Sequence, residues 1–304
     1  MRWPALLAFM LVSLVSTTSL AQLGELRPVS AGYEYYAPVS FRPNGSKLAF
    51  DTYRANAGFP FALTPKTFII PSVGYQLVHA HNTGEQSGST DLHNITVGHT
   101  LARSFSDRWF GILMVNFGVA SNLAGPLTGA DLYVSGNVIA MYKIGSAFSI
   151  GAGVAYDRRT GSITPVPLGA LYWEPVRNFA VRGVIPSSAY VTWRPATLVT
   201  LELMSALDGQ RFHLSDRSWG DRDASVAYSL VKVGAGARVH FGKLAHLELL
   251  GGAVVARRFE LFVDDRSDAG GTIPPAPFFG VNLWLGTSGW QSDLPRPPEK
   301  TKTQ

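Results

Sequence analysis

The sequence predicts an all-β protein, an antiparallel up-and-down transmembrane β-barrel of about 12 strands, with about 14 as the alternative. Three observations predict this fold. Hydrophobic residues recur with a period of two, short and long connections alternate along the chain, and aromatic residues gather beside the short connections. Only 15% of the 304 residues are charged, whereas soluble globular chains average roughly 25%. The chain has no cysteine, which excludes disulfides and thiolate metal sites.

Residues 1–21 have the layout of a secretory signal peptide. Arg2 precedes an apolar stretch from Ala5 to Val15, and the small-residue exit Ser19–Ala21 follows, so cleavage is expected before Gln22. No later run reaches the roughly 18 apolar residues that a membrane-spanning helix needs. We therefore expect a barrel over residues 22–286 and a disordered, proline-containing tail over residues 287–304.

Period-two alternation marks the strands in order along the chain. In residues 148–156 one face carries large apolar side chains, and the other carries alanine, serine and glycine. Residues 199–207, 230–241 and 279–286 alternate in a similar way, while residues 109–120 are apolar on both faces apart from Asn116. About eleven strands are expected from Lys66 onward, and residues 29–54 supply one or two more.

The connections between these strands are of two kinds. Tight turns are expected at residues 105–109, 144–148, 173–179, 193–198 and 241–244. Longer polar connections alternate with them at residues 82–91, 121–130, 157–165, 208–224 and 264–275, with one brief exception at 186–188. In an up-and-down sheet this order places the tight turns at one end, as in outer-membrane barrels, and the aromatic residues beside them match an interfacial girdle. Because hydrocarbon leaves unpaired backbone groups without water, such a sheet must close, with an even number of strands.

The segment Leu92–Asp208, and within it the run Leu101–Trp109 with the hairpins that follow, resembles uncharacterised bacterial outer-membrane β-barrel families known as domains of unknown function. The resemblance implies an outer-membrane location and no established ligand. Many barrels of this kind end at an aromatic residue used in assembly. Here Trp284 is followed by further residues to Gln304, which makes any such signal internal.

The main candidate site is the lumen. Polar residues that lie opposite apolar faces are expected to point into it: Glu202, Lys232, Arg238, His240, His246 and Glu248. They form either a network that plugs a narrow bore or a polar path with some charge selectivity.

Two other clusters offer weaker candidates. His79, His81 and His93 have side chains that suit zinc, nickel or copper, but they share a face with apolar residues that is expected to look outward, so no metal is predicted. The loops around Asp208–Asp223 and Asp264–Asp268 mix acidic and basic residues and match no ordered calcium loop.

These observations favour an integral protein of the cell outer membrane that acts as a small-solute channel or transporter, or as a structural barrel. A soluble secreted or periplasmic β-sandwich binding module is the first alternative. A barrel-embedded lipid hydrolase using His99 or His213 is the second, although no catalytic motif is present and no enzyme is expected. The expected partners are outer-membrane lipid, small polar solutes and the barrel assembly machinery. No cofactor is expected, and because the net charge of +5 is spread along the chain, no nucleic acid is expected either.

Overall fold

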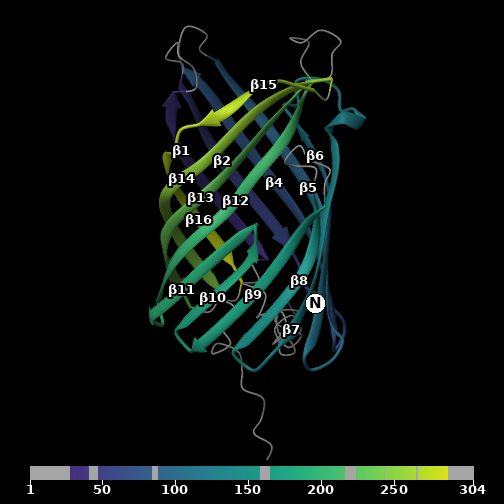
Figure 1. The fold of residues 1–304 in the computed structure, drawn as a ribbon, viewed down its shortest axis with the longest axis vertical. Helices are drawn as coiled ribbons and strands as arrows, with labels where there is room; N and C mark the ends of the chain where they lie inside the picture. The colour runs from purple at the N-terminus through teal and green to yellow at the C-terminus, as the bar shows by residue number, and fades with distance from the viewer. Residues whose placement is uncertain are drawn as a thin grey trace, which may run out of the picture.

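The structure is a closed antiparallel β-barrel of 14 spanning strands (Figure 1). It is a computed structural model that describes residues 28–40, 47–83, 88–157, 165–215, 224–242, 244–264 and 266–286. The elements follow the chain in this order: β1 (Val29–Ser40), β2 (Lys47–Gly58), β3 (Phe61–Thr64), β4 (Thr67–Thr83), β5 (Gly88–Ser104), β6 (Trp109–Ser121), the 3-10 turn η3 (Gly129–Asp131), β7 (Leu132–Lys143), β8 (Phe148–Asp157), β9 (Val166–Val176), β10 (Phe179–Ile185), β11 (Ser188–Ala196), β12 (Val199–Leu214), β13 (Ala224–Phe241), β14 (Ala245–Val263), β15 (Arg266–Ile273) and β16 (Ala276–Leu285). The predicted signal peptide and C-terminal tail lie outside the described residues.

The predicted all-β, up-and-down fold is confirmed, with the alternative strand number. Sixteen strand segments form 14 spanning strands, since β3 pairs only with β4 and β15 pairs only with β14. The favoured number of about 12 was too low, because β1 and β2 both precede Lys66 and twelve spanning strands follow it. Closure is made by β1, where Tyr33 lies opposite Tyr53 of β2 and Val281 of β16. One closed sheet replaces the two sheets of the sandwich alternative, which is therefore wrong as a fold.

Side chains alternate between the two faces of the wall. On β12, Leu201 and Leu203 are 38% and 61% exposed, while Thr200 and Glu202 are buried. The same contrast on the other strands gives an outer surface rich in valine, leucine, phenylalanine and isoleucine. A contiguous apolar band of this kind is what a bilayer solvates, whereas in water it would be an aggregation surface. Among the described residues, no helix is long and apolar enough to span a bilayer.

The two ends of the barrel differ. The turn end carries the tight connections, and exposed aromatic residues surround it: Phe105, Trp109, Trp173, Trp193 and Phe241. The loop end carries the longer connections (Figure 1). The segregation of connections predicted from the sequence is present, including the brief exception between β10 and β11.

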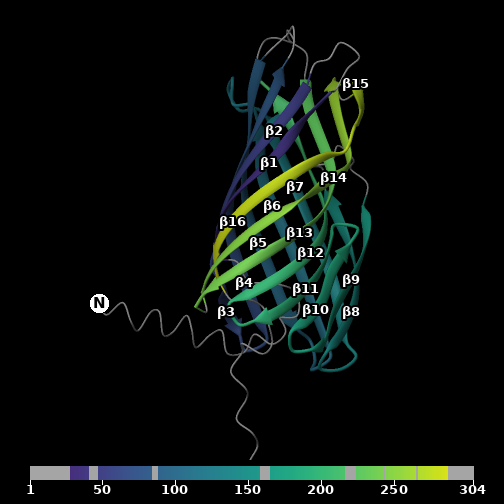
Figure 2. The same ribbon diagram turned by 90° about the vertical axis from the view of Figure 1, so that its left-hand side faces the viewer.

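The wall is not equally high all round. β10 and β11 have 7 and 9 residues, against 16 in β12 and 19 in β14, and they lie in the lower part of the barrel (Figure 2). Above them, the free end of β12 reaches β6, where His213 pairs in parallel with Ser121. The Asn122 amide donates to the His213 carbonyl at 3.1 Å, and the Ser215 hydroxyl donates to the Asn122 side chain at 2.8 Å. The loop end is therefore closed by fewer strands than the turn end.

Candidate functional site

All six predicted lumen residues lie on the inward faces of β12, β13 and β14, and each is at most 6% exposed. They do not form one cluster. Lys232 lies halfway along β13, while the other five lie close to the turn end. The structure joins Glu202, Lys232, Arg238 and Glu248 to further residues in two groups of four charges, named the turn-end tetrad and the central tetrad, while His240 and His246 form a separate chain of hydrogen bonds.

The turn-end tetrad consists of Arg182, Glu202, Arg238 and Glu248. The Arg238 guanidinium donates to Glu248 at 2.6 Å and to Glu202 at 3.4 Å, and Arg182 of β10 donates to Glu202 at 3.2 Å. Asn282 adds a hydrogen bond of 3.0 Å to Glu248. Two cations balance two carboxylates, which offsets much of the cost of taking these charges out of water. Arg182 was missed from the sequence because its strand is short and weakly patterned.

Beside this tetrad, two histidines form a directional chain of hydrogen bonds. His246 Nε2 lies 3.0 Å from the Gly286 carbonyl, which only accepts, so this nitrogen carries a proton. In the neutral ring the His246 Nδ1 then accepts from His240 Nδ1 at 2.6 Å, and His240 Nε2 accepts from the Thr200 hydroxyl at 2.8 Å. Trp284 stacks on His246 with ring centroids 3.9 Å apart. The chain ties the β13–β14 turn to the end of β16.

The central tetrad consists of Glu34, Arg54, Asp208 and Lys232, and it spans the lumen. Lys232 of β13 contacts Glu34 of β1 at 2.9 Å and Asp208 of β12 at 3.3 Å. Arg54 of β2 donates to Glu34 at 2.9 Å and also to Asp208, so it reaches from one side of the barrel to the other. Asp208 is therefore a lumen residue and not, as the sequence suggested, part of an outer loop. Glu34 of β1 was not predicted as a lumen residue. The alternation of Gly32, Glu34 and Tyr36 with Tyr33 and Tyr35 could have indicated it.

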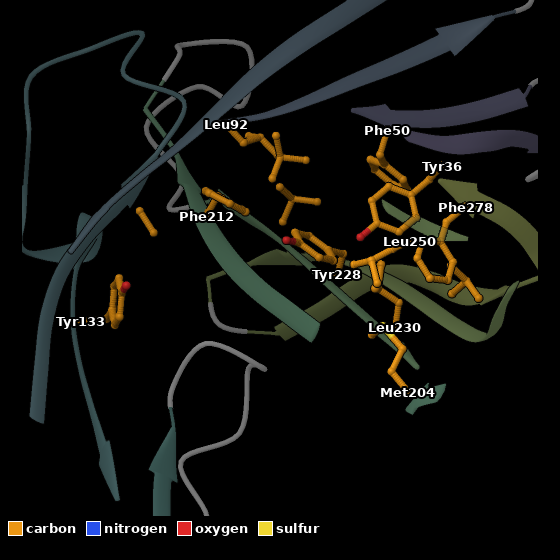
Figure 3. Packing of buried hydrophobic residues seen from close by; sticks show 14 residues of the cluster. Tyr36, Phe50, Leu92, Tyr133, Met204, Phe212, Tyr228, Leu230, Leu250 and Phe278 are labelled. Carbon is orange, nitrogen blue, oxygen red and sulfur yellow. The ribbon is translucent and has the colours of Figure 1, made fainter. Parts of the chain in front are cut away.

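The lumen wall opposite the turn-end tetrad is apolar. It is a buried cluster from β4, β5, β6, β7 and β9: Phe68, Ala102, Phe110, Ile112, Ile139, Met141, Leu168 and Ala170. Toward the loop end, a second apolar cluster lines the interior, and its aromatic rings converge from several strands (Figure 3). Between these regions the side chains of Arg54 and Asp208 remain 29% and 21% accessible.

The three histidines named as weak metal candidates lie on the outer face and make separate contacts. His79 pairs with Asp91, His81 lies 3.2 Å from Asp51, and His93 lies 2.9 Å from the Tyr75 hydroxyl. The structure thus places His79 and His81 together, with rings 3.9 Å apart, but ties His93 to a different partner. Among the described residues, no group of three or more histidine or acidic side chains is arranged to hold a metal ion.

Of the two histidines considered for hydrolysis, His99 is exposed on the outer face of β5. His213 contacts the Asp131 carboxylate at 2.9 Å, and Thr128 and Ser121 bond to the same carboxylate. Burial alone would raise the pKa of Asp131, but the hydrogen bonds from Ser121, Thr128 and His213 outweigh it and lower the pKa. These contacts fasten η3 to the β6–β12 junction. In the two loops weighed for calcium, Asp216, Asp221, Asp223 and Asp265 lie outside the described residues.

A closed barrel with an apolar outer face and ion pairs on its inner face is a β-barrel of the outer-membrane type. By sequence the chain belongs to the family described as "Domain of unknown function (DUF6268)", whose model matches residues 20–268. The resemblance stated from the sequence is therefore confirmed.

Solved structures of similar fold are outer-membrane barrels. A deltaS2 mutant of the TodX monoaromatic hydrocarbon channel has a TM-score of 0.50 and 10% identity, covering 90% of this chain and 92% of that chain. An outer membrane channel from Pseudomonas putida F1 has a TM-score of 0.45 and 9% identity, covering 87% and 97% respectively. The translocator domain of the autotransporter NalP from Neisseria meningitidis has a TM-score of 0.36 and 12% identity, covering 92% and 96%. At 10% identity, the likeness to the TodX mutant shows the fold alone. No curated protein matches the chain by sequence.

Proposed function

We propose that the protein is an integral outer-membrane channel for small solutes that combine an apolar body with a polar group. The observation that carries the proposal is the divided lumen. One wall presents the turn-end tetrad, the opposite wall presents Phe68, Phe110 and Ile112, and accessible ion-paired side chains lie between these regions and the loop end. The polar group of such a solute can contact the charged wall while its apolar body contacts the opposite wall.

The width of the barrel supports the same proposal. Side chains just fill barrels of about 8 strands, and barrels of about 16 to 18 strands leave an aqueous channel. Fourteen strands lie between these cases, so side chains set how open the bore is. Here the central tetrad and the apolar cluster at the loop end restrict it. We take these contacts as the closed gate of the channel.

The remaining parts of the proposal follow from the outer surface. The apolar band meets outer-membrane lipid, and the chain reaches that membrane through the barrel assembly machinery. No catalytic step, cofactor or nucleic acid is part of the proposed function. The contacts of the Asp131 carboxylate support a structural role for His213. This carboxylate bonds to His213 and also to other groups that hold the β6–β12 junction together.

The proposal is tested by conductance of the purified protein in planar bilayers. The double variant Arg54→Gln/Asp208→Asn removes the ionic bridge across the lumen while keeping both side chains polar, and it should raise the open probability several-fold. The control is Arg258→Gln, because Arg258 lies on the outer face with its side chain 66% exposed. A wild-type protein and a bridge variant that both insert but never conduct would leave a structural barrel as the function.

Location is tested separately by fractionation. The protein should remain in the outer membrane after a carbonate wash, and its gel mobility should change on boiling. Recovery in the soluble fraction would contradict the proposed location.

A further inference from the structure

A buried arginine near the loop end, Arg257, belongs to neither tetrad. Arg257 lies on β14 and is 2% exposed. Its Nε, Nη1 and Nη2 atoms are all buried, and none has a hydrogen-bond partner among the described residues. Its guanidinium faces the ring of Phe50, at 5.3 Å from the ring centroid.

A β-bulge explains why Arg257 points inward. Along β14 the inward positions are even-numbered from His246 to Val254. Opposite Val231 and Lys232 the register shifts, so that Ala256 pairs with Val231 and Val254 pairs with Lys232. The extra residue, Val255, reverses the alternation beyond it and turns Arg257 to the inside. The neighbouring Arg258 then lies outside and bonds to Glu260.

Within the part of the chain that the structure describes, no carboxylate pairs with Arg257. Each cation of the two tetrads contacts at least one carboxylate, and each tetrad sums to zero. Burying a guanidinium without a partner is unfavourable because it loses its hydration and gains no hydrogen bond. Among the described residues, the loop-end half of the lumen therefore carries one positive charge without a hydrogen-bond partner, with five donor positions in a fixed plane.

The surroundings of this charge are aromatic. Phe50 lies between two other rings, at 6.1 Å from Phe259 and 6.1 Å from Tyr228. Tyr36 is the strand neighbour of Phe50 on β1, and Leu230 is the strand neighbour of Arg257 on β13. Leu48 and Phe259, which pack against this cluster, are only partly buried.

We infer that Arg257 and the rings around Phe50 form a binding site for a monocarboxylate with an aromatic or aliphatic body, entered from the loop end. The planar guanidinium fork matches a carboxylate through two parallel hydrogen bonds. The apolar rings receive the body of the ligand, and they would oppose a strongly hydrated inorganic anion because its water would have to be removed. The inference rests on the proposed channel function. It specifies the class of solute, and it makes Arg257 the charged group that the solute meets on entering from the loop end.

The experiment is equilibrium binding of benzoate to the full-length protein in detergent, measured by calorimetry, with benzamide and inorganic phosphate as comparison probes. Benzoate should bind at least tenfold more tightly than benzamide, which has the same ring but no charge. Arg257→Met should weaken benzoate binding at least tenfold, and the matched control Arg258→Met should leave it unchanged. Arg257→Lys keeps the charge without the fork and should give an intermediate loss, which serves if the methionine variant does not fold.

Three results would overturn the inference. They are no benzoate binding to protein that still shows the folded gel mobility, binding that Arg257→Met and Arg257→Lys leave unchanged, or phosphate binding as tight as that of benzoate. The last result would indicate a site for small inorganic anions. Binding and conductance separate the two proposals. A protein that conducts but does not bind benzoate keeps the channel and loses the site, and one that binds but never conducts keeps the site and loses the channel.

Discussion

Two buried arginines on neighbouring strands should respond in opposite ways to the same substitution. Arg238 is 1% exposed and holds two carboxylates, Glu248 at 2.6 Å and Glu202 at 3.4 Å. Arg257 is 2% exposed, and none of its guanidinium nitrogens is hydrogen-bonded to a described residue. Methionine removes the charge in both places and keeps much of the unbranched stem.

The expected magnitudes follow from what each substitution leaves behind. Removing one partner of a buried ion pair costs about 3–5 kcal/mol, because the other charge stays buried. After Arg238→Met, Glu202 still has Arg182 and Glu248 still has Asn282, so a loss of about 3 kcal/mol is expected. Arg257→Met leaves no charge behind and removes an unpaired group, whose burial costs about 1–3 kcal/mol, so the variant should gain about that much.

The assay is reversible urea unfolding of the protein in lipid vesicles, followed by tryptophan fluorescence and by the gel mobility of the folded form. The difference between the two variants should be about 4–6 kcal/mol. Arg258→Met, on the exposed outer face, should stay within about 0.5 kcal/mol of the wild type. Destabilisation of similar size in both variants would refute the reasoning, since it would mean that Arg257 is as well paired as Arg238.

Three further predictions concern other parts of the barrel. Leu203→Arg places a charge on the outer face, where Leu203 is 61% exposed, and it should cost about 2–4 kcal/mol in vesicles; a change below about 0.5 kcal/mol in the same unfolding assay would indicate that this face meets water. Gly118→Val should cost about 1–3 kcal/mol, because a Cβ atom at Gly118 would lie 2.3–2.5 Å from atoms of the Tyr133 side chain, and Tyr133→Ala in the same background should recover part of that loss. The β6–β12 junction should loosen in acid: the folded-state pKa of Asp131 is lowered, so its stabilisation is fully present above its ordinary pKa of about 3.9 and is lost as the pH falls through the folded value. Hydrogen exchange at the Asn122 amide should accelerate at low pH relative to its intrinsic rate, and in Asp131→Asn this extra acceleration should be absent.

Much of the fold could be predicted because alternation and turn spacing are local properties. The even-numbered positions of residues 199–207 and 230–241 point inward as the pattern predicts, since no bulge interrupts them. The pattern fails at Val255, where one inserted residue reverses the faces of β14 and brings Arg257 inside. Nothing in a period-two pattern marks such an insertion.

The partners across the lumen were beyond prediction for a different reason. Arg54 and Asp208 are 154 positions apart in the chain, and their contact depends on the stagger of the strands around the barrel. The period-two alternation predicts which face of the sheet a residue lies on, but not its position along the barrel axis. Consequently the inward position of Lys232 was readable, whereas its contacts with Glu34 and Asp208 were not.

The low wall at β10 and β11 has a consequence for the way the barrel sits in lipid. Seven residues at about 3.3 Å each cover about 23 Å along β10 before any tilt, which is less than the apolar band of about 25 Å that such barrels present. The 19 residues of β14 exceed that height more than twofold. A bilayer accommodates two such sides by thinning beside the short hairpin or by letting the barrel tilt. In either case, the molecule presents a short wall to the surrounding lipid on one side and a long wall on the other.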